Sequence, residues 1–211
     1  MTIQTARQFI NESQGKVLIA GYGSLLSHYS RLHFSQIDCF GLPVMVEGWQ
    51  RAWITRSLSE KQTYVGAIPK LGARLNGSLI ALAFDADFQR REQDYRFTQI
   101  SPDTLAIDTQ LYSDELKEFL QQQSIYICET LDVLAPENHF PVNYSYILTC
   151  LSGCYAISGM QGVNEFLALT HGWDGPINDD MQQALYPRAA PADDKLIDVL
   201  ERFLSSKALD V

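Results

Sequence analysis

Apolar residues in the first 135 positions cluster in short stretches that predict β-strands. Residues 17–20 form a continuous apolar run, and residues 64–68 and 75–84 are rich in apolar and β-branched types. Such runs, bounded by turn-forming residues, are typical of buried strands. Residues 43–57 also favour a strand, and Gly48 inside it predicts a bulge or a bend.

Short helices are predicted between and before these strands. Apolar residues recur at helical spacing over the first ten positions, which predicts an opening helix. Asp85 can cap a short helix that ends at about Glu92, and Ser113 opens another. Residues 95–100 and 125–128 are predicted to form two more strands.

The pattern changes after residue 140, where helical spacing replaces the β-type runs. The apolar residues of one predicted helical face are Ile147, Cys150, Leu151 and Cys154. Two further helices are predicted around residues 163–170 and 196–203, and no further strands are expected. The chain therefore divides into a β-rich core, residues 1–135, and a helical C-terminal extension, residues 136–211, packed on the core.

The stretch 172–194 is rich in Asp, Pro and Gly. This composition predicts an ordered loop that wraps the surface, and a solvated connector is the simpler interpretation.

Composition and charge narrow the class of protein. With 46% hydrophobic and 19% charged residues, the chain can build a core without metal or disulfide support. Its 16 basic and 25 acidic residues give a net charge of −9, which argues against nucleic acid as a partner. No signal peptide is visible and no apolar stretch is long enough to span a membrane, so we expect a soluble, cytoplasmic protein without a membrane partner.

A glycine-rich loop follows the first buried strand. Its sequence is Gly21-Tyr22-Gly23-Ser24-Leu25. The two glycines allow the backbone to bend sharply and to approach a ligand closely. If a helix starts here, its amide groups favour an anion or a developing oxyanion. The loop matches neither a P-loop nor a dinucleotide fingerprint, and a plain tight turn capped by Ser24 explains the pattern equally well.

A charged segment, residues 90–96, joins the short helix to the next strand. Its carboxylates are Glu92 and Asp94. A carboxylate at such a junction can act as a general base if packing shields it from water and raises its pKa. From the residues alone, a solvated charged turn is the preferred interpretation.

Metal and thiol chemistry are not indicated. Cys150 and Cys154 lie four residues apart on an apolar helical face, where cysteine packs as a small hydrophobic residue. His139 and His171 flank the pair too loosely to complete a zinc site, and no histidine partner for a thiol nucleophile is evident.

Four segments, taken in order, resemble the γ-glutamylcyclotransferase-like superfamily, including its glutathione-specific ChaC-type branch. The strand and loop of residues 17–25 look like the family's YGS loop. Residues 48–53 with Ser57, and then residues 76–82, are similar to the two strand segments that follow in many members. Residues 88–96 look like the segment that carries the family's catalytic glutamate.

This resemblance implies an α+β fold, in which a small mixed β-barrel-like sheet has surrounding helices and a helical C-terminal third. It implies an enzyme that cleaves a γ-glutamyl amide, a peptide or an amine, by intramolecular cyclisation to 5-oxoproline. No cofactor and no metal are implied. Glu92 matches the family's catalytic glutamate, which is not true of Asp94, and would act as general acid and base.

The residues that the resemblance implies for substrate binding are Tyr22, Gly23, Ser24, Leu25 and Tyr95. The loop amides would bind either the substrate's carboxylate or the tetrahedral oxyanion. Arg51 and Ser57 are further candidates for contacts to the glutamyl group. Leu25 stands where other branches carry Asn, which can change how the loop meets the substrate.

Two alternatives remain. A member of this fold can bind a small metabolite or a protein without catalysis, because a shared fold does not secure a shared reaction. A different γ-glutamyl reaction could also use the same scaffold. The leaving group and the oligomeric state are open at this stage.

Overall fold

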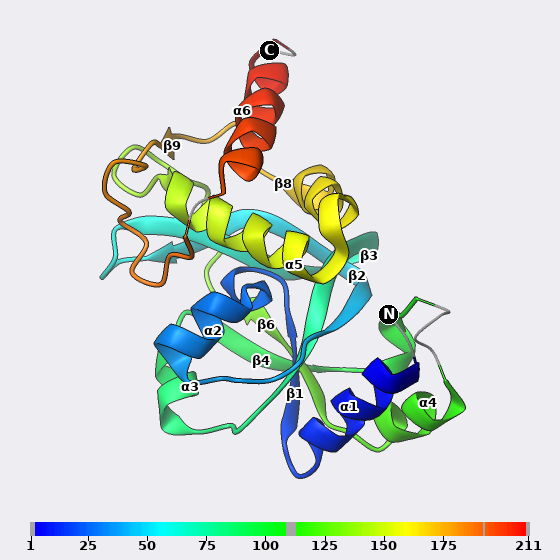
Figure 1. Ribbon diagram of the computed structural model, residues 1–211. Helices are drawn as coiled ribbons and strands as arrows, with labels where there is room; N and C mark the ends of the chain where they lie inside the picture. Colours follow the sequence, from blue (N-terminus) through cyan, green and yellow to red (C-terminus); the bar gives the residue numbers. More distant parts are fainter. Residues whose placement is uncertain (1–2, 109–112, 192, 210–211) are drawn as a thin grey trace.

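A curled, mixed β-sheet forms the centre of the molecule (Figure 1). The computed structural model describes residues 3–108, 113–191 and 193–209. Across these residues seven strands join in the order β4–β6–β1–β3–β2–β5, with β8 paired to β2. The strands of this sheet are β1 (Val17–Gly21), β2 (Leu42–Ser57), β3 (Gln62–Leu82), β4 (Tyr95–Ile100), β5 (Leu105–Ala106), β6 (Ile125–Thr130) and β8 (Thr170–His171). The predicted α+β class is therefore confirmed.

The helices surround this sheet. They are α1 (Ile3–Ser13), η1 (Ser24–Leu26), α2 (His28–Ser35), α3 (Ala86–Arg91), η2 (Pro102–Thr104), α4 (Asp114–Gln121), α5 (Tyr144–Leu169) and α6 (Asp194–Leu209). Helix α5 lies across the sheet above β2 and β3 (Figure 1), while a hydrogen bond between Arg91 and Ser35 links the ends of α3 and α2. Helices α1 and α4 contact each other on the opposite side.

Strands β2 and β3 form one long antiparallel hairpin, because both contain extended runs of apolar and β-branched residues. The register between them shifts from Glu47 to Trp49, and Gly48 between these two residues has a φ of +80°. A left-handed backbone at the extra residue of a bulge favours glycine. The bulge predicted at Gly48 is thus confirmed.

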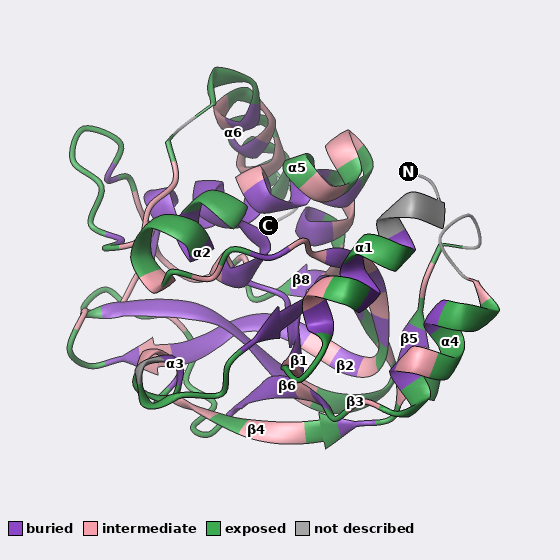
Figure 2. Ribbon diagram, turned by 60° about the horizontal axis from the view of Figure 1, so that its bottom comes forward, coloured by how far each residue is buried: buried purple, intermediate pink, exposed green. Residues whose placement is uncertain are grey.

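Strand β1 occupies the middle of the sheet. It pairs antiparallel with β3 and parallel with β6, so its residues are covered on both sides by neighbouring backbone. Residues Leu18, Ile19 and Ala20 are fully buried, which agrees with the continuous apolar run in the sequence. The burial pattern in Figure 2 shows the central strands enclosed, whereas the outward faces of α1, α2 and α4 are exposed. The loop that follows β1 consequently starts from a rigid position.

The helical last third differs from its prediction in one respect. Two short strands, β7 (Val142–Asn143) and β9 (Ile177–Asn178), pair with each other, and β8 pairs with β2, so the expectation of no further strands is wrong. A two-residue pairing gives no periodic signal in the sequence, which explains this error. The two helices predicted on either side of residue 158 are present as the two segments of α5, which are separated by non-helical backbone at Ser158 and Gly159.

The segment 172–194 is not a solvated connector throughout. Tyr186 and Asp180 within it are buried. The Asp180 carboxylate accepts hydrogen bonds from the backbone N–H of Ser145 (2.8 Å) and that of Leu185 (2.7 Å). The Ser145 hydroxyl also donates to Asp180 and accepts from the N–H of Tyr186. These bonds fasten residues 179–190, hereafter the strap, onto the start of α5.

Across the described residues, no helix is both long enough and apolar enough to cross a membrane.

Candidate active site

The glycine-rich loop leaves the end of β1 at Gly21 and enters η1 at Ser24. A β-carbon at Gly21 would lie 2.8 Å from side-chain atoms of Ile80 and of Leu25. A β-carbon at Gly23 would lie 2.8 Å from Val65 and from the Tyr146 hydroxyl. Both glycines are therefore required because neighbouring side chains press against the loop backbone.

Two buried arginines hold the carbonyl groups of this loop from behind. Arg51 Nη1 donates to the carbonyl of Tyr22 at 3.1 Å. Arg31 Nη1 donates to the carbonyls of Leu25 at 2.5 Å and of Leu26 at 3.1 Å. The first N–H groups of η1 have no acceptor within their own helix. Because the two arginines bind the loop carbonyls, the loop backbone is held in place and can present these amides to a ligand.

Arg51 is a structural residue of the loop. It is fully buried, and its five N–H groups donate to the Thr170 hydroxyl, the carbonyls of Tyr22, Asn76 and Phe166, and the Asn76 side-chain oxygen. Burial lowers the pKa of its guanidinium to about 10. Since every N–H is occupied, Arg51 has none to offer a glutamyl group. Ser57, the other weaker candidate, lies at the end of β2 and hydrogen-bonds Ser59.

Glu92 is positioned by the short helix α3, as the sequence suggests. The Asp85 side chain caps this helix by accepting from the N–H of Phe88 at 2.9 Å, and Glu92 is the residue at the C-terminal end. Only 9% of Glu92 is exposed, so it does not lie in a solvated turn. Burial raises the pKa of its carboxyl, while the positive charges of Arg91 and Arg188 oppose that effect.

Arg91 connects Glu92 to the loop. Its Nε lies 3.0 Å from Glu92 Oε1, and its Nη2 donates to the Ser24 hydroxyl at 3.2 Å. A third bond from Nη1 reaches the hydroxyl of Ser35 at the end of α2. Ser24 does not cap a helix, because the N-cap of η1 is Gly23 and Ser27 caps α2. Its hydroxyl instead accepts the hydrogen bond from Arg91.

A small cavity lies between the loop and Glu92. The residues that line it are Ala20, Gly21, Tyr22, Gly23, Ser24, Leu25, Val65, Glu92, Tyr95, Cys128 and Tyr146. The structure thus brings Glu92, the loop and Tyr95 to one place, although they come from β1 and η1, the end of α3 and β4. The cavity has a volume of about 30 Å³, which is enough for about two water molecules.

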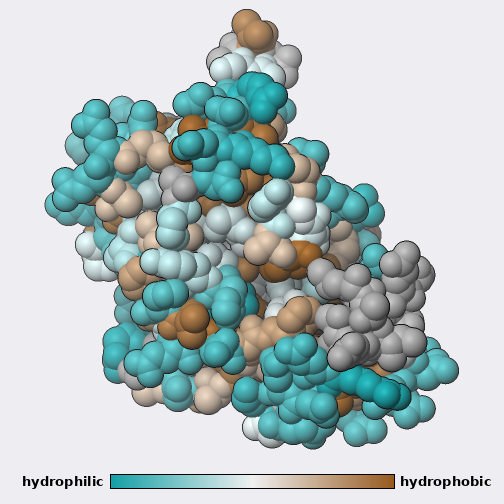
Figure 3. Space-filling model, viewed as in Figure 1, coloured by the Kyte–Doolittle hydropathy of each residue, from teal (hydrophilic) through white to brown (hydrophobic). Residues whose placement is uncertain are grey.

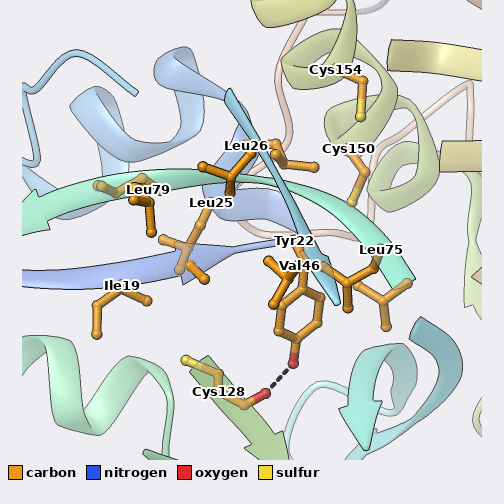
Figure 4. Close-up of a cluster of buried hydrophobic side chains, with 14 of the residues drawn as sticks. Ile19, Tyr22, Leu25, Leu26, Val46, Leu75, Leu79, Cys128, Cys150 and Cys154 are labelled. Carbon is orange, nitrogen blue, oxygen red and sulfur yellow. Dashed lines mark hydrogen bonds between the residues drawn. The ribbon is translucent and has the colours of Figure 1, made fainter. Parts of the chain in front are cut away.

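Three tyrosines form the cavity's walls. The Tyr22 hydroxyl donates to the carbonyl of Cys128, as Figure 4 shows, and the Tyr95 hydroxyl donates to the carbonyl of Val65 at 2.8 Å. Burial raises the pKa of Tyr22, Tyr95 and Tyr146 well above that of a free tyrosine. These phenols are therefore neutral near pH 7 and act as hydrogen-bond donors.

Four residues near this site were not expected from the sequence. Tyr146 of α5 lines the cavity opposite Gly23, and Arg91 links its two sides. Tyr186 and Arg188 come from the strap, where Arg188 Nε donates to the Tyr186 hydroxyl at 3.2 Å. The only signal for them in the sequence is a Tyr-Pro-Arg triplet within a stretch that composition assigns to a connector.

Comparison by structure finds similar proteins where comparison by sequence does not. No protein-family model matches the chain, and no curated protein matches it either. An uncharacterized human protein superposes with a TM-score of 0.56 at 11% identity, over 89% of this chain and 99% of its own. A structure described as a gamma-glutamyl cyclotransferase gives a TM-score of 0.52 at 12% identity, with the same coverage of 89% and 99%. YkqA from Bacillus subtilis gives 0.53 at 12% identity, over 82% and 60%.

The chain therefore has the γ-glutamyl cyclotransferase-like fold, with the helical C-terminal region predicted for it. A match over 89% of the chain extends beyond residue 135, into the helical last third. The sequence resemblance, by contrast, covers the β-rich part.

Proposed function

We propose that this protein is a cofactor-independent enzyme that cleaves a γ-glutamyl amide by cyclisation and releases 5-oxoproline. The single observation that carries this proposal is the burial of Glu92 in the same cavity as the loop of residues 21–25. A proton carrier and a set of backbone amides are the two groups that this reaction needs from a protein. The likeness in fold to a gamma-glutamyl cyclotransferase supports the same reaction.

The substrate supplies its own nucleophile. Its α-amine, as the free base, attacks the γ-carbonyl carbon and forms the new C–N bond of a five-membered ring, and the Glu92 carboxylate takes up the proton that the ring nitrogen then loses. The tetrahedral oxyanion is stabilised by amides of the loop. The bond to the leaving amine then breaks as Glu92 returns the proton to that amine, so atoms balance without water. Holding the amine beside the carbonyl supplies the entropic part of the acceleration.

The environment of Glu92 suits both halves of this cycle. Burial raises the pKa of its carboxyl, which brings it closer to the pH at which it must both accept and donate a proton. The positive charge of Arg91, whose Nε lies 3.0 Å from Glu92 Oε1, opposes this rise and favours the carboxylate form. Tyr22 and Tyr95 are the neutral walls against which the glutamyl chain would fold.

The enclosed part of the cavity, about 30 Å³, is smaller than a γ-glutamyl group. A bound substrate would therefore either extend out of the cavity on its open side or displace one of its walls. The tyrosine rings that line the cavity beside Gly23 and Cys128 are Tyr146 and Tyr22.

The decisive experiment compares the native protein with Glu92→Gln on glutathione, γ-glutamyl dipeptides and γ-glutamylamines. Mass spectrometry would detect 5-oxoproline and identify the released amine. We expect turnover of at least one compound, and a loss of about two to four orders of magnitude in Glu92→Gln because the amide cannot carry the proton.

The matched control is Glu115→Gln, which removes a carboxylate of an exposed Arg–Glu pair on α4. Its turnover should equal that of the native protein. If no γ-glutamyl compound yields 5-oxoproline, or if Glu92→Gln remains fully active, the proposal fails and a non-catalytic binding role takes its place.

A further inference from the structure

Arg91 is buried below a hydrophilic surface. Figure 3 shows that hydrophilic residues predominate on the face of the molecule that carries α2 and α3, yet only 8% of the Arg91 side chain is exposed. Arg90, its neighbour in the sequence, is exposed. A buried guanidinium is costly unless its N–H groups have acceptors and its charge has a partner. The partners of Arg91 therefore indicate its role.

Three segments of the chain supply these partners. Arg91 Nε donates to Glu92 Oε1 at 3.0 Å, and Nη2 donates to the hydroxyl of Ser24, in the glycine-rich loop, at 3.2 Å. Nη1 donates to the hydroxyl of Ser35 at the end of α2. A planar guanidinium holds several acceptors in fixed directions, which the ammonium of a lysine does not do. Arg91 thus fixes the carboxylate of Glu92 relative to the loop.

The two carboxylate oxygens of Glu92 differ in their surroundings. Within the described residues, the Glu92 side chain has one hydrogen bond, which its Oε1 accepts from Arg91. Oε1 is therefore occupied by a donor, and Oε2 is the oxygen with capacity for a proton. A group that transfers a proton must lie at a defined position, because a displacement of about 1 Å can lower a rate about a hundredfold.

The charged and titratable groups around Glu92 come from several elements. They are Arg91, Arg188, Asp94, Tyr22, Tyr95 and Cys128. Burial raises the pKa of the two phenols and of the thiol well above their ordinary values, so these three groups are neutral near pH 7.

The remaining three groups are charged near neutral pH and act on Glu92 in opposite directions. Burial is the main cause of the raised pKa of Glu92, and the negative charge of Asp94 adds to it, whereas Arg91 and Arg188 oppose it. Arg91 has the larger effect of the two arginines. It contacts Glu92 directly, while Arg188 forms an ion pair with Glu60 at 3.2 Å. Loss of the Arg91 charge should therefore be visible in the ionisation of Glu92.

We propose that Arg91 is a positioning residue for Glu92, which holds Oε1, fixes the carboxylate relative to the loop through Ser24, and leaves Oε2 to take up and release the proton. Ser35 anchors the guanidinium to α2 in this arrangement. The inference rests on the proposed function for the identity of the reaction. The ionisation of Glu92, in contrast, can be measured without a substrate.

The first test removes the charge of Arg91. In Arg91→Gln the pKa of Glu92 should rise by about one unit or more, because the carboxylate loses its cationic partner. NMR titration of protein labelled at the δ-carbon of glutamate measures this pKa, and Glu92→Gln assigns the signal. Arg90→Gln, which removes the exposed neighbouring arginine, is the matched control and should leave the pKa unchanged. The same pKa in folded Arg91→Gln as in the native protein would overturn the proposal.

The second test keeps the charge and removes the planar guanidinium. Arg91→Lys places a cation beside Glu92 but cannot bind the carboxylate and both hydroxyls in the same geometry. With the γ-glutamyl compound that the native protein turns over best, kcat should fall about ten- to a hundredfold. The acid limb of kcat/KM should stay near its native pH in Arg91→Lys and move to higher pH in Arg91→Gln. Native kcat in Arg91→Lys would contradict the proposal, also if Arg91→Gln does not fold.

Ser24→Ala tests the link to the loop. Alone, this change should lower kcat several-fold. In the Arg91→Lys background it should cause little further loss, because the link is already broken and the two changes are not independent. Ser206→Ala, which removes an exposed hydroxyl of α6, is the control. Losses that combine in full would show that Ser24 acts independently of Arg91, which would contradict the proposed link.

The NMR titration separates this inference from the reaction itself. If Arg91→Gln raises the pKa of Glu92 while the native protein turns over no γ-glutamyl compound, the contact between Arg91 and the carboxylate stands and the proposed reaction fails. If 5-oxoproline forms, but neither Arg91 variant changes the pKa of Glu92 or kcat, the reaction stands and the role of Arg91 fails.

Discussion

At the scale of single residues, the central feature is a carboxylate kept away from water. Glu92 has 9% of its surface exposed and one cationic neighbour, Arg91, in direct contact. Burial disfavours the charged form, and Arg91 favours it. Burial outweighs Arg91, so the pKa of Glu92 lies above its ordinary value. A raised pKa suits a carboxyl group that must both take up and release a proton.

The pH dependence of turnover should report this raised pKa. Only the carboxylate form of Glu92 accepts a proton, so kcat/KM should decline as the pH falls through a value above the ordinary carboxyl pKa of 4.5. A pH profile of 5-oxoproline release checks this. A profile that stays flat down to pH 4.5 would contradict the assignment of Glu92.

The same shift has a consequence for stability, of defined sign. Below pH 4.5 the carboxyl is protonated in both the folded and the unfolded chain. As the pH rises through the raised pKa, the unfolded chain releases its proton first, so the native protein loses stability relative to Glu92→Gln. Each pH unit by which the pKa is raised is worth about 1.4 kcal/mol. Denaturant titrations of both proteins from pH 4 to pH 8 should show this widening difference.

At the scale of elements, the contact between α5 and the loop decides the shape of the site. Gly153 of α5 packs directly on the backbone of Leu26 and Ser27, where a β-carbon has no room. This close approach places Tyr146, two turns earlier in the helix, against Gly23. A change in the spacing between α5 and η1 would therefore be transmitted to the cavity.

Gly153→Ala tests this coupling. The added methyl group must push α5 away from the backbone of η1, so we expect a loss of about 1–3 kcal/mol in the free energy of unfolding, by overpacking. Turnover should fall in parallel because Tyr146 is displaced. Gln161→Ala, on an exposed position of the same helix, serves as the control. A Gly153→Ala protein with native stability and native turnover would show that the contact is not rigid.

The elements that the sequence predicts well are those with a local signal. Each of these signals lies within a few residues of its element: the apolar run of β1, the Asp85 cap of α3 and the glycine of the β2 bulge. The two-residue strands β7, β8 and β9 leave none, because their pairing depends on segments distant in the chain. The two helical segments of α5 also have a local signal, because each has its own apolar face, and the backbone between them leaves the helical conformation at Ser158 and Gly159.

The same distinction applies to the candidate site. Glu92 and the loop can be predicted from the sequence, because the segments that contain them resemble those of the superfamily and follow one another in the same order. The hydrogen bond from Arg91 to Ser24 and the position of Arg188 near the site cannot be predicted in this way, because both depend on tertiary packing. Arg51 is only a candidate contact to the glutamyl group at the level of sequence, because a buried arginine that holds backbone carbonyls cannot be told there from one that binds a ligand.

At the scale of the whole molecule, the site draws on both ends of the chain. The loop and Glu92 come from the β-rich part, while Tyr146, Tyr186 and Arg188 come from α5 and the strap. The division into a core, residues 1–135, and an extension, residues 136–211, remains a prediction. The cavity beside Glu92 is lined by residues from both sides of position 135, so its walls depend on both.

Asp180→Asn tests the role of the strap. The change replaces a carboxylate oxygen that accepts from Ser145 and Leu185 with an amide donor, which leaves a buried N–H without its acceptor. We expect a cost of about 1–3 kcal/mol and faster hydrogen exchange at the amides of Leu185 and Tyr186. Asp179→Asn, an exposed neighbour, is the control. Unchanged exchange at both amides would show that Asp180 does not fasten the strap.

The late position of the strap in the chain has a consequence for biosynthesis. A ribosome produces the loop and Glu92 long before it reaches Tyr186 and Arg188. Domains fold as they emerge, from the N-terminal side onwards. A nascent chain arrested before residue 188 would hold the acid, the amide loop and Tyr146, but not Arg188, whose positive charge opposes the rise in the pKa of Glu92. The full electrostatic environment of Glu92 would consequently be acquired only after the strap has been made.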